Sequence, residues 1–365
     1  ARSECGSSGV SVKVVFRTDA SREIGSGHVM RCLNLAHGLR LRGATVSFIM
    51  RAHEGNLATE IMRSGFELTT LPIAKTGTQG SLGASWVEDA KQTSQLLEVV
   101  PDWLITDHYG IDDRWHRAIR PFTTRIMAID DLANRLHDCD LLLDQNLSEQ
   151  GDGKYTQLTP SHCVCLLGPR YALLGSEYSQ LHDRCVPRGG AVRRLLVFFG
   201  GADRDGLCLR SLDALIHLKR SDLSVDMVAG SASVDFETLR MRALAHPNVR
   251  IHRALPSLAP LMVTADLFIG AGGSTSWERL CLGLPSIVVT VADNQIPVTK
   301  LLAQRGLTQW LGDAEKTNAP AITAALSQWC NTGIPVSWFP DFGTLVDGRG
   351  VNRVCAALIK LGHEK

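Results

Sequence analysis

Short apolar runs alternate with helical patterns along most of the chain, and this alternation constrains the fold more than any other feature of the sequence. A strand followed by a helix and then by a further strand favours parallel pairing, because the helix carries the chain back across one face of the sheet. Parallel sheets of this kind are usually covered by helices on both faces. The sequence therefore predicts an α/β protein.

The predicted elements form two series, separated by a stretch that ends in "RCVPRGGAVRR" at 184–194. Strands are expected at 12–16, 45–50, 103–106, 125–129, 141–144 and 164–167 in the first series, and at 195–199, 224–228, 249–252, 267–269 and 286–291 in the second. Helices are expected at 28–42, 56–64, 85–100 and 112–120, then at 206–218, 234–245, 257–264, 274–282 and 350–361.

We therefore expect two Rossmann-like, doubly wound domains, at 12–187 and 188–348, because 365 residues suffice for two cores. Residues 349–365 should form a helix that folds back on the first domain, and residues 1–11 a disordered or vector-derived tail. Ligands of such folds bind beyond the carboxyl ends of the strands. Two facing domains would place that binding site in the cleft between them.

The composition narrows the classes of partner. Apolar residues make up 44% of the chain, charged residues 21%, and the net charge is +1. We therefore expect no nucleic-acid partner and no membrane partner, and a cytoplasmic location. The ten cysteines are scattered, and Cys163 and Cys165 form the only tight pair, which argues against paired metal knuckles. Buried, reduced thiols are the expected state.

The segment "REIGSGH" joins the first predicted strand to the first predicted helix. Gly25 and Gly27 allow a sharp turn and a close approach of the backbone to a ligand. His28 stands where the helix should begin, and the positive helix end would keep its imidazole neutral and able to accept a proton. A glycine turn with a surface histidine is the alternative. The segment lacks the GxGxxG pattern of dinucleotide-binding proteins, so that function is disfavoured.

Acidic and aromatic side chains follow two strands of the first series. "ITDHYG" places Asp107 and Tyr109 at one strand end, and Asp130 and Asp131 follow the next strand. Side chains at such ends often contact a ligand, although acids there can also cap helices. A two-metal site would need Asp140 as well, but Asp140 opens a strand and should point away. We therefore expect no metal and no other cofactor.

Glycine turns in the second series indicate a phosphate site. "FFGGAD" places Gly200 and Gly201 after one strand, and "GAGGSTSWE" follows another with a turn and a helix start. Backbone N–H groups at such a turn can bind a diphosphate without a cation. The residues of the second turn that we assign to this site are Gly272, Gly273, Ser274 and Thr275.

Three further polar residues of the second domain are candidate ligand contacts. Glu278 lies on the same side of its helix as Ser274, and its carboxylate could accept both hydroxyls of a ribose. An acid placed there only for the helix dipole is the alternative. Asn294 and Gln295 follow the last predicted strand, at the same rim of the cleft.

Several of these motifs occur together in a known order. "FRTDASREIGSGHVMRCLNLA", "DHYGI", "GGAD", "GGSTSWE" and "DNQ" resemble the UDP-2,4-diacetamido-2,4,6-trideoxy-β-L-altropyranose hydrolase family of bacterial pseudaminic acid biosynthesis, over about residues 12–360. Spore-coat polysaccharide proteins share these motifs. The family is itself similar to the UDP-N-acetylglucosamine transferase of peptidoglycan synthesis, which implies a GT-B fold.

The resemblance implies hydrolysis of a UDP-sugar by attack of water at the anomeric carbon, with inversion and without metal. It implies that His28 is the catalytic base and that UDP contacts the glycine turns and Glu278. The residues expected to contact the substrate are Arg17, Asp19, Gly25, Gly27, Asp107, Tyr109, Asn294 and Gln295. A small-molecule UDP-sugar is then the partner, and the protein is expected to be a monomer.

Two other functions remain compatible with these residues. A GT-B glycosyltransferase would hold UDP in the same way and use His28 to deprotonate an acceptor hydroxyl. A non-catalytic UDP-sugar sensor would have no use for a base in the "GSGH" loop. We therefore favour the hydrolase, with the transferase second.

Overall fold

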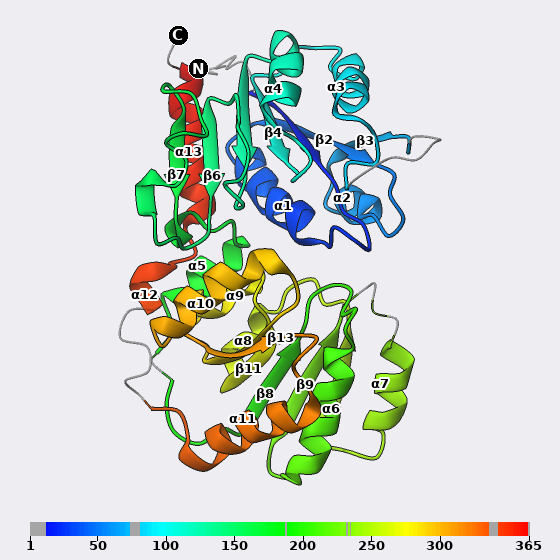
Figure 1. The fold of residues 1–365 in the computed structure, drawn as a ribbon, viewed down its shortest axis with the longest axis vertical. Coiled ribbons are helices and arrows are strands. Elements are labelled where there is room, and N and C mark those ends of the chain that lie inside the picture. Colours follow the sequence, from blue (N-terminus) through cyan, green and yellow to red (C-terminus); the bar gives the residue numbers. More distant parts are fainter. Residues whose placement is uncertain are drawn as a thin grey trace, which may run out of the picture.

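A computed structural model describes residues 12–73, 81–186, 188–230, 233, 235–335 and 342–363. The described residues form two parallel sheets, one in each of two stacked units (Figure 1). The predicted tail at 1–11, which includes Cys5, lies outside them.

The first sheet has seven strands in the order β3-β2-β1-β4-β5-β6-β7. Its strands are β1 (Lys13–Thr18), β2 (Thr45–Arg51), β3 (Glu67–Leu71), β4 (Trp103–Asp107), β5 (Arg125–Ile129), β6 (Leu141–Asp144) and β7 (Val164–Leu167). Its helices are α1 (Gly27–Arg40), α2 (Ala58–Arg63), α3 (Trp86–Gln95) and α4 (Asp113–Ile119).

The second sheet has six strands in the order β10-β9-β8-β11-β12-β13. Its strands are β8 (Arg194–Phe198), β9 (Ser224–Ala229), β10 (Val249–Arg253), β11 (Leu267–Ala271), β12 (Ser286–Thr290) and β13 (Gln309–Asp313). The helices of the remaining chain are α5 (Ser176–His182), α6 (Leu207–Leu218), α7 (Phe236–Ala243), α8 (Ala259–Thr264), α9 (Thr275–Cys281), α10 (Ile296–Gln304), α11 (Ala319–Thr332), α12 (Phe342–Leu345) and α13 (Gly350–His363).

Alternate residues of each strand point to opposite faces, so each sheet has two cores. On β4, Ile105 packs towards α1 and α13, whereas Leu104 packs towards Trp115 of α4 on the other face. On β8, Val197 packs towards α6 and α11, and Leu196 packs with residues of α8, α9 and α10. The apolar runs read from the sequence are thus the strands of two helix-covered parallel sheets.

Two segments cross between the units. Helix α5 follows the first sheet in sequence, but Tyr178 packs in the core of the second unit beside α8 and α9. Helix α13 returns to the first unit, where Val354, Cys355 and Leu358 join the core beside α1. Figure 1 shows α13 alongside β6 and β7. The chain therefore enters the second unit before the boundary at 187/188 that the sequence suggested.

The described cysteines are free thiols. Cys32, Cys139, Cys208, Cys281 and Cys355 are buried, and the other four are partly buried. In the part of the chain that the structure describes, no helix is both long and apolar enough to cross a bilayer.

Four charged side chains form a network beneath the carboxyl end of the first sheet. Arg17 donates to Asp89 and, at 2.6 Å, to Asp19, and Arg51 donates to Asp89 at 2.6 Å. All four residues are fully buried. Burial would raise the pKa of Asp89, but the charges of Arg17 and Arg51 and their hydrogen bonds lower it below its usual value. Each buried charge is thus held by an opposite one.

This burial corrects one expectation. Arg17 and Asp19 were predicted to contact substrate, but neither side chain lines the cleft described below. Asp19 accepts from the backbone N–H of Arg51 as well as from Arg17, so it joins β1 to β2.

We expect Asp89→Asn to lower the free energy of unfolding by about 3–5 kcal/mol, because it leaves two buried guanidinium groups short of one negative charge. Urea unfolding measures this change. Asp152→Asn, at an exposed position, is the matched control and should change the free energy by less than about 0.5 kcal/mol. A loss below about 1 kcal/mol for Asp89→Asn would show that the network does not depend on that charge.

Candidate active site

A cleft of ≈ 510 Å³ lies between the two units, and its lining comes mainly from segments that follow the carboxyl ends of strands. The first unit contributes residues after β1, β4, β5 and β6, and the second contributes residues after β8, β11 and β12. This is the position at which parallel α/β sheets bind ligands. The predicted candidates among the lining residues are Gly25, Gly27, His28, Tyr109, Gly200, Gly201, Gly272, Gly273, Ser274, Thr275, Asn294 and Gln295.

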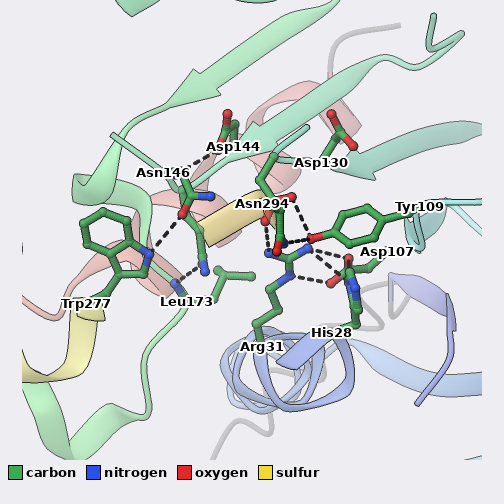
Figure 2. A network of polar contacts seen from close by, with 12 residues as sticks. His28, Arg31, Asp107, Tyr109, Asp130, Asp144, Asn146, Leu173, Trp277 and Asn294 are labelled. Atoms are coloured by element: carbon green, nitrogen blue, oxygen red, sulfur yellow. Dashed lines mark hydrogen bonds and ion pairs between the residues drawn. The ribbon is translucent and has the colours of Figure 1, made fainter. Parts of the chain in front are cut away.

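His28 lies in the first turn of α1 and forms a dyad with Asp107 at the end of β4 (Figure 2). The His28 Nδ1 atom is 2.5 Å from Asp107 Oδ1, and His28 is only 6% exposed. An ionised carboxylate only accepts, so Nδ1 must carry the hydrogen of this bond. In the neutral ring the other nitrogen, Nε2, is then a proton acceptor.

Arg31 keeps Asp107 ionised. Its Nε and Nη2 atoms each donate to Asp107 at 2.6 Å, in a bidentate pair. Burial would raise the pKa of Asp107, but the charge of Arg31 and then that of His28 hold it well below its usual range. Asp107 itself is fully buried and does not line the cleft. The structure therefore places Asp107 behind His28 and Arg31, which both line the cleft, and not at the cleft surface where a direct substrate contact was predicted.

A chain of hydrogen bonds joins the two units beside the dyad. Asn294 donates to the Tyr109 hydroxyl at 2.9 Å, and this hydroxyl donates to Asp131 at 2.8 Å. The rings of Tyr109 and His28 meet edge to face at 4.6 Å. Burial and the charge of Asp131 raise the pKa of Tyr109, so its hydroxyl remains a donor. Tyr109 and Asn294 thus meet across the cleft, next to the imidazole (Figure 2).

The two glycine turns of the second unit pack closely against neighbouring segments. Gly200 has a φ of 89°, a conformation that favours glycine. A Cβ on Gly201 would lie 3.1 Å from Ser26 Oγ, so the turn after β8 approaches the loop that carries His28. A Cβ on Gly272 would lie 2.4 Å from Thr299 Oγ1, which explains glycine at the turn after β11.

Glu278 is the UDP-binding candidate that does not line the cleft. Burial and the charge of Glu177 raise the pKa of its carboxyl to about 7, although a hydrogen bond with Tyr178 opposes the shift. Its role towards a ribose stays a prediction.

No group of three or more metal-ligating side chains that could hold a metal ion occurs among the described residues. Of the three carboxylates weighed for a two-metal site, Asp140 pairs with Arg120 at 2.6 Å, and Asp130 accepts from Tyr155. Only Asp131 lines the cleft.

Sequence reasoning missed Arg31 and Trp277. Arg31 lies three residues after His28 and therefore on the same face of α1, a spacing that could have drawn attention to it. Trp277 donates from Nε1 to Asn146 Oδ1 at 3.2 Å, across the two units (Figure 2). Nothing in the sequence brings these two positions together, because they lie 131 residues apart.

Comparisons with known proteins come from sequence and from structure. No protein-family model matches the chain. An uncharacterised protein of Methanocaldococcus jannaschii is 24% identical over 287 residues, which is 76% of this chain and 55% of that protein. The chain thus spans about half the length of this relative.

Two relatives have named functions. UDP-2,4-diacetamido-2,4,6-trideoxy-β-L-altropyranose hydrolase of Campylobacter jejuni is 27% identical over 296 residues, 81% of this chain and 97% of that protein. A spore coat polysaccharide biosynthesis protein of Bacillus subtilis is 28% identical over 200 residues, 54% of this chain and 59% of that protein.

The structure is similar to that of MurG from Acinetobacter baumannii, with a TM-score of 0.65 over 96% of this chain and 99% of that one, at 14% identity. This likeness confirms the predicted architecture of two parallel-sheet domains, which is the GT-B fold.

We expect Gly230→Ala to displace the turn after β8, because the added Cβ would lie 2.2 Å from the carbonyl oxygen of Gly201. With UDP as the probe, calorimetric titration should show binding at least about tenfold weaker. Gly153→Ala is the control, since a Cβ there meets nothing within 4 Å. Unchanged binding in Gly230→Ala would exclude this turn from the ligand site.

Proposed function

We propose that the chain hydrolyses a UDP-linked 2,4-diacetamido-2,4,6-trideoxy hexose of the altropyranose type, releasing the free sugar and UDP in pseudaminic acid biosynthesis. The observation that carries the proposal is the His28–Asp107 dyad, because its histidine lines the same cleft as the glycine turns of the second unit. The relative from Campylobacter jejuni, matched over 97% of its length, supports the choice of substrate.

The geometry supports a single displacement at the anomeric carbon. A water molecule beside Nε2 of His28 attacks this carbon while the bond to the UDP oxygen breaks, and the bonding electrons leave with UDP. The water proton passes to Nε2, and Asp107 stabilises the imidazolium that forms. One displacement inverts the configuration at the carbon.

The second unit is suited to hold the leaving group. Its glycine turns can donate backbone N–H groups to a diphosphate, which stabilises the charge that grows as UDP departs. UDP is a good leaving group, so the reaction needs no second carboxylic acid of the kind that ordinary glycosidases use. We propose that the reaction proceeds in this way without a metal ion.

A UDP-sugar glycosyltransferase is the second candidate, and the GT-B fold is compatible with it. The same dyad would deprotonate an acceptor alcohol in place of water. Adding alcohols to the hydrolysis assay separates the two: the hydrolase forms free sugar at full rate without them.

We expect His28→Ala to lower the rate of UDP release from the diacetamido-trideoxy altrose nucleotide by about 10²–10⁴-fold, because the attacking water loses its base. The dissociation constant for UDP should stay within about threefold, since the second unit holds the nucleotide. Equal rates in both proteins would remove His28 from the chemistry. No release by either protein, with or without an alcohol, would indicate a UDP-sugar sensor.

We expect Asp107→Asn to lower the same rate by about 10²–10⁴-fold, because an amide no longer fixes the proton on Nδ1. UDP binding, measured by calorimetry, should again persist. Asp152→Asn should leave the rate unchanged, as residue 152 is exposed and outside the cleft. An Asp107→Asn variant that folds and retains its rate would show that His28 needs no orienting carboxylate.

A further inference from the structure

Three arginines line the cleft among the described residues, and they differ in the partners of their guanidinium groups. Arg31 is committed to Asp107 and lies 3.3 Å from Asp131. Arg22 pairs with Glu54 at 3.1 Å on the surface. Arg204 is exposed and makes no hydrogen bond or ion pair with another described residue. Among the described residues, Arg204 is therefore the arginine of the cleft whose charge is free to meet an anionic ligand.

The loop that carries Arg204 is held in place by hydrogen bonds of the preceding residue, Asp203. Asp203 has a φ of 43°, in the left-handed region, and is 5% exposed. Its carboxylate turns into the protein and accepts from the backbone N–H groups of Leu207 and Cys208, at 2.8 and 2.9 Å, where α6 begins. Because Asp203 is anchored in this way, the backbone of Arg204 is held at the cleft.

Arg204 is close to the glycine turn at which the phosphates of the proposed nucleotide would bind. It lies three residues after Gly201, whose turn approaches Ser26 and the loop of His28. A diphosphate joined to a sugar at the imidazole would lie beside this turn. A guanidinium can contact two oxygens of a phosphate at once, and the charge of the second phosphate makes that contact stronger.

We propose that Arg204 binds the phosphate next to the sugar and selects a nucleoside diphosphate over a nucleoside monophosphate. This inference rests on the proposed function for the identity of the nucleotide. Arg204 is a binding residue in it, and the base remains His28. Asp205 also lines the cleft, and its negative charge opposes binding of phosphates that Arg204 does not neutralise.

Calorimetric titration of the full chain with UDP and with UMP tests this assignment. Arg204→Gln should weaken UDP about ten- to a hundredfold and UMP less than about threefold, because UMP lacks the phosphate that Arg204 contacts. Arg204→Lys should regain part of the UDP affinity. Arg305→Gln, an exposed arginine outside the cleft, should change neither affinity.

The possible results distinguish a failure of the Arg204 assignment from a failure of the proposed hydrolysis. UDP affinity within about threefold of the parent in Arg204→Gln, or an equal loss for UDP and UMP, would overturn the role of Arg204. If the unaltered chain binds UDP but never releases it from the sugar nucleotide, the proposed hydrolysis is wrong, while the selective loss of UDP affinity still supports Arg204. If the unaltered chain does not bind UDP, both are overturned.

Discussion

The ion pair between Arg31 and Asp107 is the interaction on which the site depends. It keeps a fully buried carboxylate ionised at the end of the central strand β4, where an isolated charge would be costly. That carboxylate in turn sets the hydrogen on Nδ1 of His28, and so leaves Nε2 of the neutral ring as the acceptor. The proposed base thus depends on three residues, two on helix α1 and one at the end of strand β4.

The two units contribute different parts of the cleft. The first unit contributes His28 to the cleft, and the second contributes the glycine turns after β8 and β11. The hydrogen bond from Asn294 to Tyr109 joins the units beside His28, so the proposed base and the proposed leaving-group site share one cleft. The chain also crosses between the units twice, since α5 packs in the core of the second unit and α13 in the core of the first.

The sequence predicted the fold well where strands are buried on both faces, because each gives an apolar run; every predicted strand overlaps an observed one. The edge strands β3 and β13 were missed, since they are partly exposed and carry mixed residues. Helix α11 was missed although Asn318 and the proline of its first turn are start signals.

The motifs identified most of the candidate residues that line the cleft. They gave no indication that Arg17 and Asp19 belong to a buried charge network. Such pairings depend on Arg51 and Asp89, which only the folded sheet brings near.

The central claim is that water activated by His28 attacks the anomeric carbon and leaves UDP intact. Hydrolysis of the sugar nucleotide in water enriched in heavy oxygen, followed by mass spectrometry of both products, tests it most directly. The account predicts that the heavy oxygen appears in the free sugar and that UDP carries none. Label in the terminal phosphate of UDP would mean that water attacks phosphorus, which contradicts the role assigned to His28.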